Sequence, residues 1–418
     1  MQIEIINTGS ELLLGRTLNT HSQWLARRLA DRGLVVTRQT TVADRGSEIV
    51  TAVREALTRA ELVITTGGLG PTSDDLTRQV LAEMLGKKLH EDAAVLATIE
   101  KRFAARNRVM PASTRVQALV PEGALVLANA QGTAPGLALE VRLGAWLIML
   151  PGPPRELRPM FDEVVLPLLV EKFPRANEFT SLTLRTVGLG ESVIEERIAP
   201  LLRALAACGL EIGYCAHMGQ VDVRLAAHGA GREELVRAGE ALVRGELAET
   251  IFGTEDEQLE NVIVHLLTER KQTLALAESC TGGYLANRIT NVPGASAVLL
   301  AGLVTYANAA KEKFVGVRAE TLAAHGAVSE PVVREMAEGA RRVTGADFAI
   351  AVTGMAGPGG GSAEKPVGTV FLALASAHGT VVEKKFNAYE RATFKELTAQ
   401  QGLELLRQAI LTTKNPQG

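Results

Sequence analysis

The sequence predicts an α/β protein with more than one domain. Short apolar runs alternate with amphipathic stretches at both ends of the chain, and this alternation is typical of parallel strands joined by crossover helices. The chain has 418 residues, whereas a single hydrophobic core rarely grows beyond about 250–300 residues. With 46% hydrophobic and 22% charged residues, the composition is that of an ordinary globular protein.

Residues 1–172 are expected to form a three-layer α/β domain. Periodicity and apolar runs predict strands at 3–6, 34–41, 62–66 and 145–150, and helices at 19–32, 46–60 and 156–172. Residues 178–250 are expected to form a small α+β module with no evident chemistry. Its predicted strands are 181–187 and 220–227, and its predicted helices are 193–206 and 232–246.

Residues 256–414 are expected to form a third, α/β domain. The predicted strands are 273–277, 298–306, 348–352, 368–375 and 380–386, and the predicted helices are 258–270, 309–315, 331–343 and 391–411. We therefore expect three domains.

Charge and cysteine content narrow the class of function. Lys and Arg total 44 against 47 Asp and Glu, and only 4% of residues are aromatic, so a basic, stacking nucleic-acid surface is not expected. The three cysteines, Cys208, Cys215 and Cys280, are too few for a disulfide framework or a zinc site. No signal-peptide pattern or membrane-length apolar run is evident. We expect a cytoplasmic protein with small-molecule substrates and no membrane partner.

The segment from Glu278 to Gly283 lies at a predicted strand-to-helix turn. Free backbone N–H groups of Thr281, Gly282 and Gly283 would favour a phosphate or a developing oxyanion there. The alternative is a capped helix start, in which Ser279 or Thr281 accepts an N–H.

A lysine follows this turn after the next predicted strand. A serine attacks an amide only if a base removes its proton, and Lys311 is the available base because His325 is the one histidine nearby. The pKa of such a lysine must be lowered by burial or by a second cation. Alternatively, Lys311 is an exposed helix cation and Tyr306 a packing residue.

The Gly-rich loop 353–362 follows the predicted strand 348–352. So many glycines require either unusual backbone angles or close approach to a ligand, and open α/β sheets place their sites after such strands. A plain flexible loop is the alternative.

Several of these segments together resemble the CinA C-terminal domain. They are Ala277–Gly283, Thr305–Asn308, Gly326–Pro331, Gly357–Gly360 and Glu364–Val370. The resemblance implies an amidohydrolase that converts nicotinamide mononucleotide into nicotinate mononucleotide and ammonia with a Ser/Lys pair and no cofactor.

The resemblance also implies roles for individual residues. Ser296 is the first choice for the nucleophile, with Lys311 as its base and Tyr306 assisting proton transfer or orienting the pyridine. Ser279 is the second choice; otherwise it binds the phosphate or the oxyanion with Thr281, Gly282 and Gly283. Thr353 and Gly354 would lie against the substrate. Arg391 would hold the phosphate, although the Gly-Asp-Arg turn usual in the family is Tyr389-Glu390-Arg391 here.

A second Gly-rich segment, residues 65–77, follows the predicted strand 62–66. Its glycines permit close approach to a phosphate, and Asp75 is expected to begin a helix. Asp74 and Asp75 could cap that helix or hold a divalent metal against a pyrophosphate. The first loop, residues 9–15 with 19–20, could reach the same crevice, and residues 132–136 form another Gly/Pro-rich loop.

The Gly-Gly-x-Gly and Asp-x-Thr pattern of this segment resembles molybdopterin-binding domains. The larger set of motifs, which adds Gly9–Gly15, Asn19–Thr20 and Leu150–Gly152, is similar to the CinA N-terminal domain. This implies a metal-dependent pyrophosphatase that splits ADP-ribose into AMP and ribose 5-phosphate. The implied nucleotide contacts are Ser10, Glu11, Asn19, Gly67, Gly68, Gly70, Asp75 and Thr77. The implied ligands of a divalent metal of unknown identity are Asp74 and Asp75.

The whole chain thus resembles a full-length CinA protein. The leading hypothesis is a bifunctional enzyme of pyridine-nucleotide recycling. The resemblance also implies a homodimer. One alternative is that only one domain is catalytic. Another is a non-enzymatic partner protein in competence or DNA damage.

Overall fold

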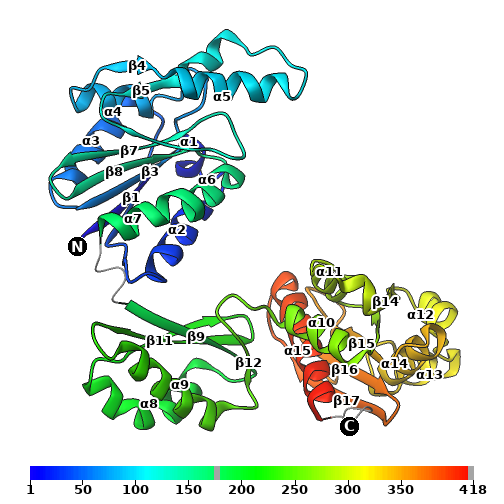
Figure 1. Cartoon of the computed structure of the whole chain (residues 1–418). Coiled ribbons are helices and arrows are strands. Elements are labelled where there is room, and N and C mark those ends of the chain that lie inside the picture. Colours follow the sequence, from blue (N-terminus) through cyan, green and yellow to red (C-terminus); the bar gives the residue numbers. More distant parts are fainter. Residues whose placement is uncertain (174–178, 413–418) are drawn as a thin grey trace. The chain divides into compact units, whose positions relative to one another are not determined.

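The computed structural model describes residues 1–173 and 179–412. The chain forms two compact units, one made of residues 1–180 with 227–232 and the other of residues 181–226 with 233–418 (Figure 1). Within the described residues, no helix is both long enough and apolar enough to cross a membrane.

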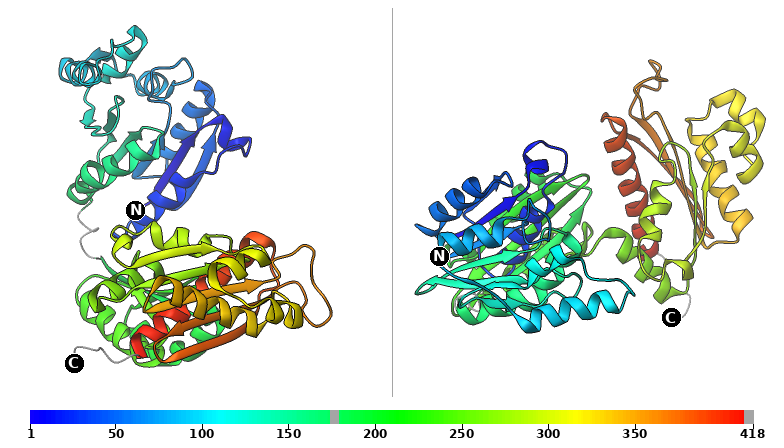
Figure 2. Two further views of the ribbon diagram at one scale, coloured as in Figure 1. Left: turned by 90° about the vertical axis from the view of Figure 1, so that its right-hand side faces the viewer. Right: turned by 90° about the horizontal axis from the view of Figure 1, so that it is seen from above.

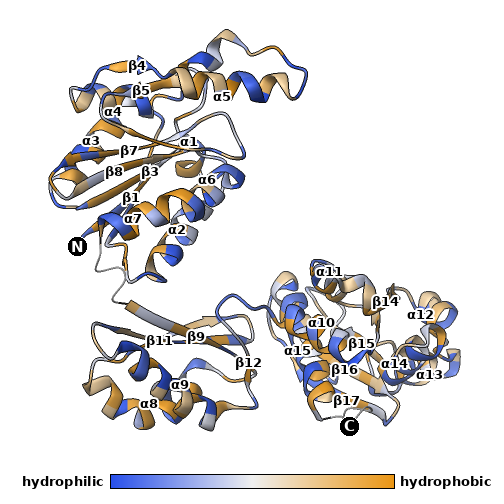
Figure 3. Ribbon diagram, viewed as in Figure 1, coloured by the Kyte–Doolittle hydropathy of each residue, from blue (hydrophilic) through white to orange (hydrophobic). Residues whose placement is uncertain are grey.

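The first unit is built on a six-stranded sheet with the order β2-β1-β3-β8-β7-β6. Its parallel strands are β2 (Arg38–Val42), β1 (Ile3–Thr8), β3 (Leu62–Thr66) and β8 (Ala145–Leu150). The edge strands β7 (Gly136–Arg142) and β6 (Leu125–Leu127) run antiparallel. The sheet is therefore mixed rather than wholly parallel. Every residue of β3 and β8 is buried, and both strands are strongly hydrophobic (Figure 3). This composition is typical of strands whose two faces are both covered by helices.

Helices cover both faces of this sheet, which gives the expected three layers (Figure 1). One face carries α2 (Thr20–Ala30), α6 (Pro154–Met160) and α7 (Leu166–Lys172), and the other carries α3 (Gly46–Leu57), α4 (Thr77–Met84) and α5 (Ala93–Ala104). The remaining elements are α1 (Ser10–Leu13), a 3-10 helix (Ala112–Ala118) and the pair β4 (Leu89–Glu91) and β5 (Leu119–Pro121). The single helix predicted at 156–172 is interrupted by a π-helical turn at Phe161–Val165. Pro159 and Pro167 flank this turn, and neither has the backbone N–H that an α-helical hydrogen bond needs.

The second unit begins with the middle module. Its four-stranded sheet has the order β10-β11-β9-β12, with α8 (Glu191–Ala207) and α9 (Arg232–Leu247) packed on one face (Figure 1). The strands are β9 (Phe179–Val187), β10 (Glu211–His217), β11 (Gln220–His228) and β12 (Ile251–Thr254). Strands β10 and β12 were not predicted; β10 is an edge strand whose side chains are largely exposed, so it lacks an apolar pattern.

The C-terminal domain contains a five-stranded sheet with the order β14-β13-β15-β16-β17. Strands β13 (Leu274–Glu278), β14 (Leu299–Val304) and β15 (Phe348–Gly354) are parallel, and β16 (Thr369–Ser376) and β17 (Gly379–Phe386) are antiparallel. One face packs on α10 (Leu259–Arg270), α11 (Tyr284–Thr290) and α15 (Arg391–Thr412), and the other on α12 (Asn308–Val315), α13 (Ala319–His325) and α14 (Glu330–Thr344). The right-hand view of Figure 2 shows α15 and α14 on opposite faces of the strands.

The middle module and the C-terminal domain share a core. Val187 and Phe252 belong to the same buried cluster as the residues of α10 and α15. The buried Arg407 of α15 donates a hydrogen bond of 2.7 Å to the carbonyl oxygen of Glu249. The two parts therefore form one packed unit.

Candidate functional site

Two adjacent parallel strands bring Ser279 and Lys311 together. Glu278 of β13 pairs with Val304 of β14, so both strands end at the same edge of the sheet. Ser279 follows β13 directly, and α12 carries Lys311 back toward it. The Nζ atom of Lys311 lies 3.1 Å from Ser279 Oγ, 2.8 Å from the carbonyl oxygen of Thr305 and 3.1 Å from that of Tyr306. The lysine is only 1% exposed, so it is not a surface cation.

Burial controls the protonation of this pair. Loss of hydration lowers the pKa of Lys311 below its ordinary value of 10.5, and the neighbouring Cys280 opposes this more weakly. Burial raises the pKa of Cys280 to about 12, so its thiol is neutral near pH 7 and supplies no counter-charge. Burial therefore shifts the amine next to the serine hydroxyl toward its uncharged form.

The turn after β13 is capped by a carboxylate. Buried Glu278 accepts the backbone N–H groups of Gly283, Leu285 and Ala286 at 2.8–3.1 Å, and the N–H of Gly282 bonds to the Ser279 carbonyl oxygen. The N–H groups of Gly282 and Gly283 are therefore not free, and the expectation that they cradle a phosphate or oxyanion is wrong for these two. Their glycines are required by backbone φ angles of +61° and +92°.

Ser296 lies at the other end of the sheet. It belongs to the 3-10 turn Ala295–Ala297, which precedes β14, whereas Lys311 follows the end of that strand. Its side chain is exposed. The structure brings Lys311 to Ser279 and not to Ser296, so the first choice of nucleophile is corrected to Ser279.

Arg391 and Tyr306 lie together beside this site. Arg391 Nη2 donates to the Tyr306 hydroxyl at 2.8 Å, and Nη1 donates to the Gly357 carbonyl oxygen at 2.7 Å. Arg391 begins α15, and Glu390 caps that helix by accepting the N–H groups of its first turn. The guanidinium thus links the end of β14 with the Gly-rich loop at Gly357.

The residues expected next to a substrate at the end of β15 have structural partners. The Thr353 hydroxyl donates to the Ala327 carbonyl oxygen at 2.9 Å. A Cβ on Gly354 would lie 2.9 Å from the Thr369 carbonyl oxygen and 3.0 Å from the Phe394 ring. Packing alone therefore accounts for the glycine at position 354.

In the first unit, the predicted Gly-rich loop after β3 packs tightly against α4. A Cβ on Gly68 would lie 2.1 Å from Thr77 Oγ1, and one on Gly70 would lie 2.3 Å from Asp75 Oδ2. Gly67 and Gly68 have φ angles of +95° and +69°. The buried Thr77 hydroxyl has no hydrogen-bond partner among the described residues.

The two aspartates of the loop differ from their expected roles. Helix α4 begins at Thr77, not at Asp75, whose carboxylate accepts the Thr72 N–H and hydroxyl. A hydrogen bond from Thr72 lowers the pKa of the exposed Asp74. Within the part of the chain described, no three His, Cys, Asp or Glu side chains gather to hold a metal. Magnesium often uses only one or two carboxylates together with substrate phosphates.

A polar network that the sequence did not reveal joins the first loop to this site. Asn19 Oδ1 caps α2, and its amide donates to Ser22 Oγ at 2.9 Å. Asn7, buried in β1, donates to Ser22 Oγ at 2.8 Å and accepts from the Thr66 hydroxyl at 2.9 Å. The polar Asn7 within the fully buried strand Ile3–Thr8 was the available signal.

His21 was also missed. Its Nε2 lies 2.5 Å from the Gly152 carbonyl oxygen, and burial lowers its pKa, so the ring is held neutral. A Cβ on Gly152 would in turn lie 3.6 Å from the Gly67 Cα. Of the first loop, Ser10 uses its backbone N–H to bind Asp44 at 2.8 Å and Glu11 is exposed.

Comparison with known proteins identifies the class of each segment. Residues 4–171 match the model of the probable molybdopterin binding domain, residues 181–253 that of the damage-inducible protein CinA KH domain, and residues 256–410 that of the CinA C-terminal domain. The chain is thus an α/β protein with a molybdopterin-binding-like domain, a KH-like module and a CinA C-terminal domain.

Relatives match over the full length. A CinA-like protein of Akkermansia muciniphila is 44% identical and covers 96% of each chain. A putative competence-damage inducible protein of Caldicellulosiruptor bescii is 43% identical, covering 98% of this chain and 100% of its own. A crystal structure from Agrobacterium tumefaciens, described as a competence/damage inducible protein, is 42% identical with a TM-score of 0.36, covering 37% of this chain and 94% of its own. The protein belongs to the CinA family.

The KH match gives the middle module a fold that the sequence analysis did not name. KH domains hold nucleic-acid backbones with a Gly-x-x-Gly loop. Residues 181–253 contain no two glycines with this spacing.

Proposed function

We propose that the C-terminal domain hydrolyses the carboxamide of nicotinamide mononucleotide, giving nicotinate mononucleotide and ammonia, with Ser279 as nucleophile and Lys311 as base. One observation carries this proposal: the amine of the buried Lys311 lies 3.1 Å from Ser279 Oγ, and burial lowers its pKa. A lysine with these properties activates a serine in the absence of a histidine.

The three contacts of Lys311 suit a neutral amine. Its two N–H bonds donate to the carbonyl oxygens of Thr305 and Tyr306, which leaves the lone pair for the Ser279 hydroxyl proton. Ser279 Oγ then attacks the carboxamide carbon, and the protonated Lys311 returns the proton to the departing ammonia. Water hydrolyses the acyl-enzyme in a second step that uses the same base.

The side chains beside the pair suit a mononucleotide. Arg391 is an ideal partner for a phosphate because its guanidinium can offer two parallel N–H groups. Tyr306 is held by Arg391 and exposes more than half of its surface, so its ring is available to orient the pyridine.

The test uses the purified full-length protein with nicotinamide mononucleotide and measures ammonia release. We expect turnover by the wild type, loss of turnover in Ser279→Ala, and unchanged turnover in Ser296→Ala. Ser296→Ala is the matched control because it also removes a serine hydroxyl, but at the other end of the strands. Activity lost in Ser296→Ala but kept in Ser279→Ala would refute the assignment. No ammonia release from the wild type would leave the amidohydrolase proposal without support.

For the first unit we propose a metal-dependent pyrophosphatase that splits ADP-ribose into AMP and ribose 5-phosphate. The Gly-rich loop and the unpaired Thr77 hydroxyl support a phosphate-type ligand. Asp74 and Asp75 would hold the divalent ion, which neutralises phosphate charge when bound.

This second proposal is tested by AMP formation from ADP-ribose with magnesium or manganese. Asp74→Asn and Asp75→Asn are expected to lower the rate, and the exposed Asp31→Asn, with the same charge change, is expected not to. Activity in one assay only would support the alternative of a single catalytic domain. Inactivity in both, without stabilisation by either nucleotide, would favour a non-enzymatic partner protein.

A further inference from the structure

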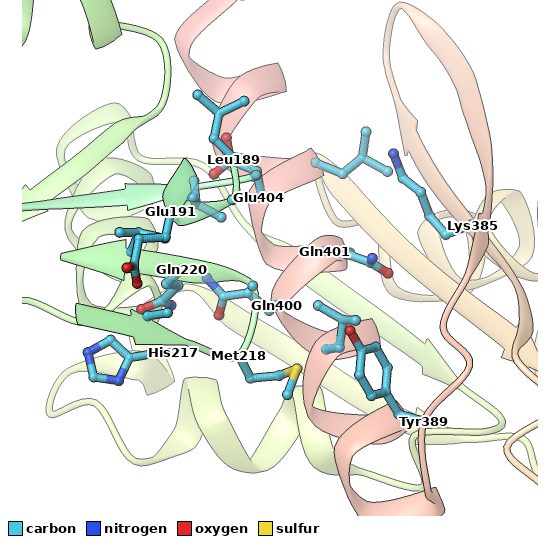
Figure 4. Close-up of a pocket in the computed structure, with 18 of the residues that line it drawn as sticks. Leu189, Glu191, His217, Met218, Gln220, Lys385, Tyr389, Gln400, Gln401 and Glu404 are labelled. Carbon is cyan, nitrogen blue, oxygen red and sulfur yellow. The ribbon is translucent and has the colours of Figure 1, made fainter. Parts of the chain in front are cut away.

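A pocket of about 520 Å³ lies within the second unit, between the middle module and the C-terminal domain (Figure 4). One wall is formed by the loop 188–190 and by the turn His217–Gln220 between β10 and β11. The other is formed by α15 and Tyr389. Its volume is within the range of small-molecule sites. Neither Ser279 nor Lys311 lines it.

One buried donor in this pocket is unused. Gln400 of α15 is only 3% exposed, and its Nε2 has no hydrogen-bond partner among the described residues. Figure 4 shows its side chain extending from the helix toward Gln220 of β11. Leaving an amide N–H₂ group buried and unpaired costs free energy, which an acceptor atom of a ligand would recover.

The neighbouring amides are already paired, which singles out Gln400. Gln401 exchanges hydrogen bonds of 2.9 and 3.1 Å with Asn387. Gln220 Oε1 accepts from Arg185 at 3.1 Å. Among the amide groups that line the pocket in the described residues, Gln400 therefore stands out by a buried donor that no hydrogen bond uses.

Carboxylates outnumber cations in the lining of the pocket, where Glu191, Glu383 and Glu404 lie with Lys385. Glu404 forms an ion pair of 2.8 Å with Arg407, and Glu383 forms one of 3.0 Å with Lys385. A polyphosphate would meet these carboxylates without a matching excess of cations, so it is disfavoured. An uncharged ligand meets no such penalty.

The remaining walls are apolar or aromatic. They include Leu189, Met218, Leu397 and the ring of Tyr389. Flat ring systems bury apolar faces against such side chains while their edges carry acceptor atoms. The volume, the apolar walls and the unpaired Gln400 donor together suit one chemical class.

We propose that this pocket binds an uncharged, planar heterocycle of nucleoside size, whose ring nitrogen or carbonyl oxygen accepts a hydrogen bond from Gln400 Nε2. This site is separate from both proposed catalytic sites and does not depend on either activity. It gives the KH-like module a small-molecule role at its junction with the C-terminal domain.

The proposal is tested by isothermal titration calorimetry of the full-length protein with adenosine and, separately, with uridine. Both probes are neutral and carry acceptor atoms on a flat ring. We expect at least one to bind the wild type and to bind Gln400→Glu at least tenfold more weakly, because the carboxylate replaces the donor with acceptors. Gln131→Glu is the matched control, since it makes the same change at an exposed position in the other unit. We expect this variant to bind the same probe with the affinity of the wild type.

A second variant separates loss of the donor from loss of the fold. Gln400→Leu keeps a similar volume and removes the unpaired donor, so we expect a melting temperature no lower than the wild type's together with lost binding. Absence of binding by both probes to the wild type would overturn the proposal. So would affinity that is unchanged in both Gln400 variants, because the ligand would then sit elsewhere.

Discussion

At the scale of single residues, the proposed chemistry depends on the amine of Lys311. We expect Lys311→Met to lower kcat for nicotinamide mononucleotide by a factor between about a hundred and ten thousand, the range typical of a general base. Methionine fills a similar volume without a basic atom, so the fold should persist. The measurement is steady-state ammonia release alongside circular dichroism. As a control, Lys313→Met on the same helix α12 should have the kcat of the wild type. A Lys311→Met protein with the kcat of the wild type would exclude Lys311 as the base.

The pH dependence follows from the direction of the Lys311 pKa shift. Only the unprotonated amine can accept the Ser279 proton, so kcat/KM should rise with pH as the neutral fraction of Lys311 increases. Because burial lowers this pKa below 10.5, the midpoint of the rise should lie below pH 10.5. A pH profile of kcat/KM checks this. A midpoint at or above that of a free lysine would mean that Lys311 is charged in the resting enzyme.

The nucleophile shows what sequence order alone can and cannot reveal. Lys311 and both serines were chosen from the sequence, but the preference for Ser296 was wrong. Ser279 is 32 positions from Lys311 along the chain, yet the parallel pairing of β13 with β14 places both at one edge. The signal was available, because Ser279 and Lys311 each follow a predicted strand, whereas Ser296 precedes one.

At the scale of helices and strands, close packing makes some glycines indispensable and leaves others replaceable. A Cβ on Gly339 of α14 would lie 1.6 Å from the Val315 carbonyl oxygen of α12, whereas one on Gly245 of α9 would meet no atom within 4 Å. We expect Gly339→Ala to lower the free energy of unfolding by at least about 1–3 kcal/mol through overpacking. Gly245→Ala should raise it by about 0.5–1 kcal/mol, because alanine favours a helix.

Urea unfolding of the two variants, monitored by circular dichroism, tests this pair. Both change a helical glycine to alanine, so helix propensity cancels and packing remains as the difference. A Gly339→Ala protein as stable as Gly245→Ala would show that α12 and α14 can move apart without cost.

Most elements could be predicted from periodicity, but their connections and edges could not. The strands 62–66 and 145–150 match their predicted bounds because they are buried on both faces and read as continuous apolar runs. The antiparallel direction of β7 depends on pairing with β8, which is not encoded locally. Helix α13 was missed because it is short, at seven residues.

At the scale of the whole molecule, the middle module contributes to the stability of the C-terminal domain. Removing residues 181–255 would withdraw Val187 and Phe252 from the shared core, and would leave the buried Arg407 without the Glu249 carbonyl oxygen. We expect a fragment of residues 256–418 to melt about 5 °C or more below a fragment of residues 181–418, since losing roughly 2 kcal/mol shifts Tm by this order. Differential scanning calorimetry of both fragments checks this, and equal melting temperatures would mean that the two parts are energetically independent.

The different surroundings of the three cysteines allow selective chemistry on the unmodified chain. Cys208 and Cys215, both in the middle module, are exposed, whereas Cys280 next to the nucleophile is buried, with a thiol pKa of about 12. Thiolates, not thiols, react with maleimides, so a fluorophore or spin probe added near neutral pH attaches to the KH-like module and spares the site of Ser279 and Lys311. Changes in the surroundings of that module can then be followed when a nucleotide is added, without first removing a native cysteine.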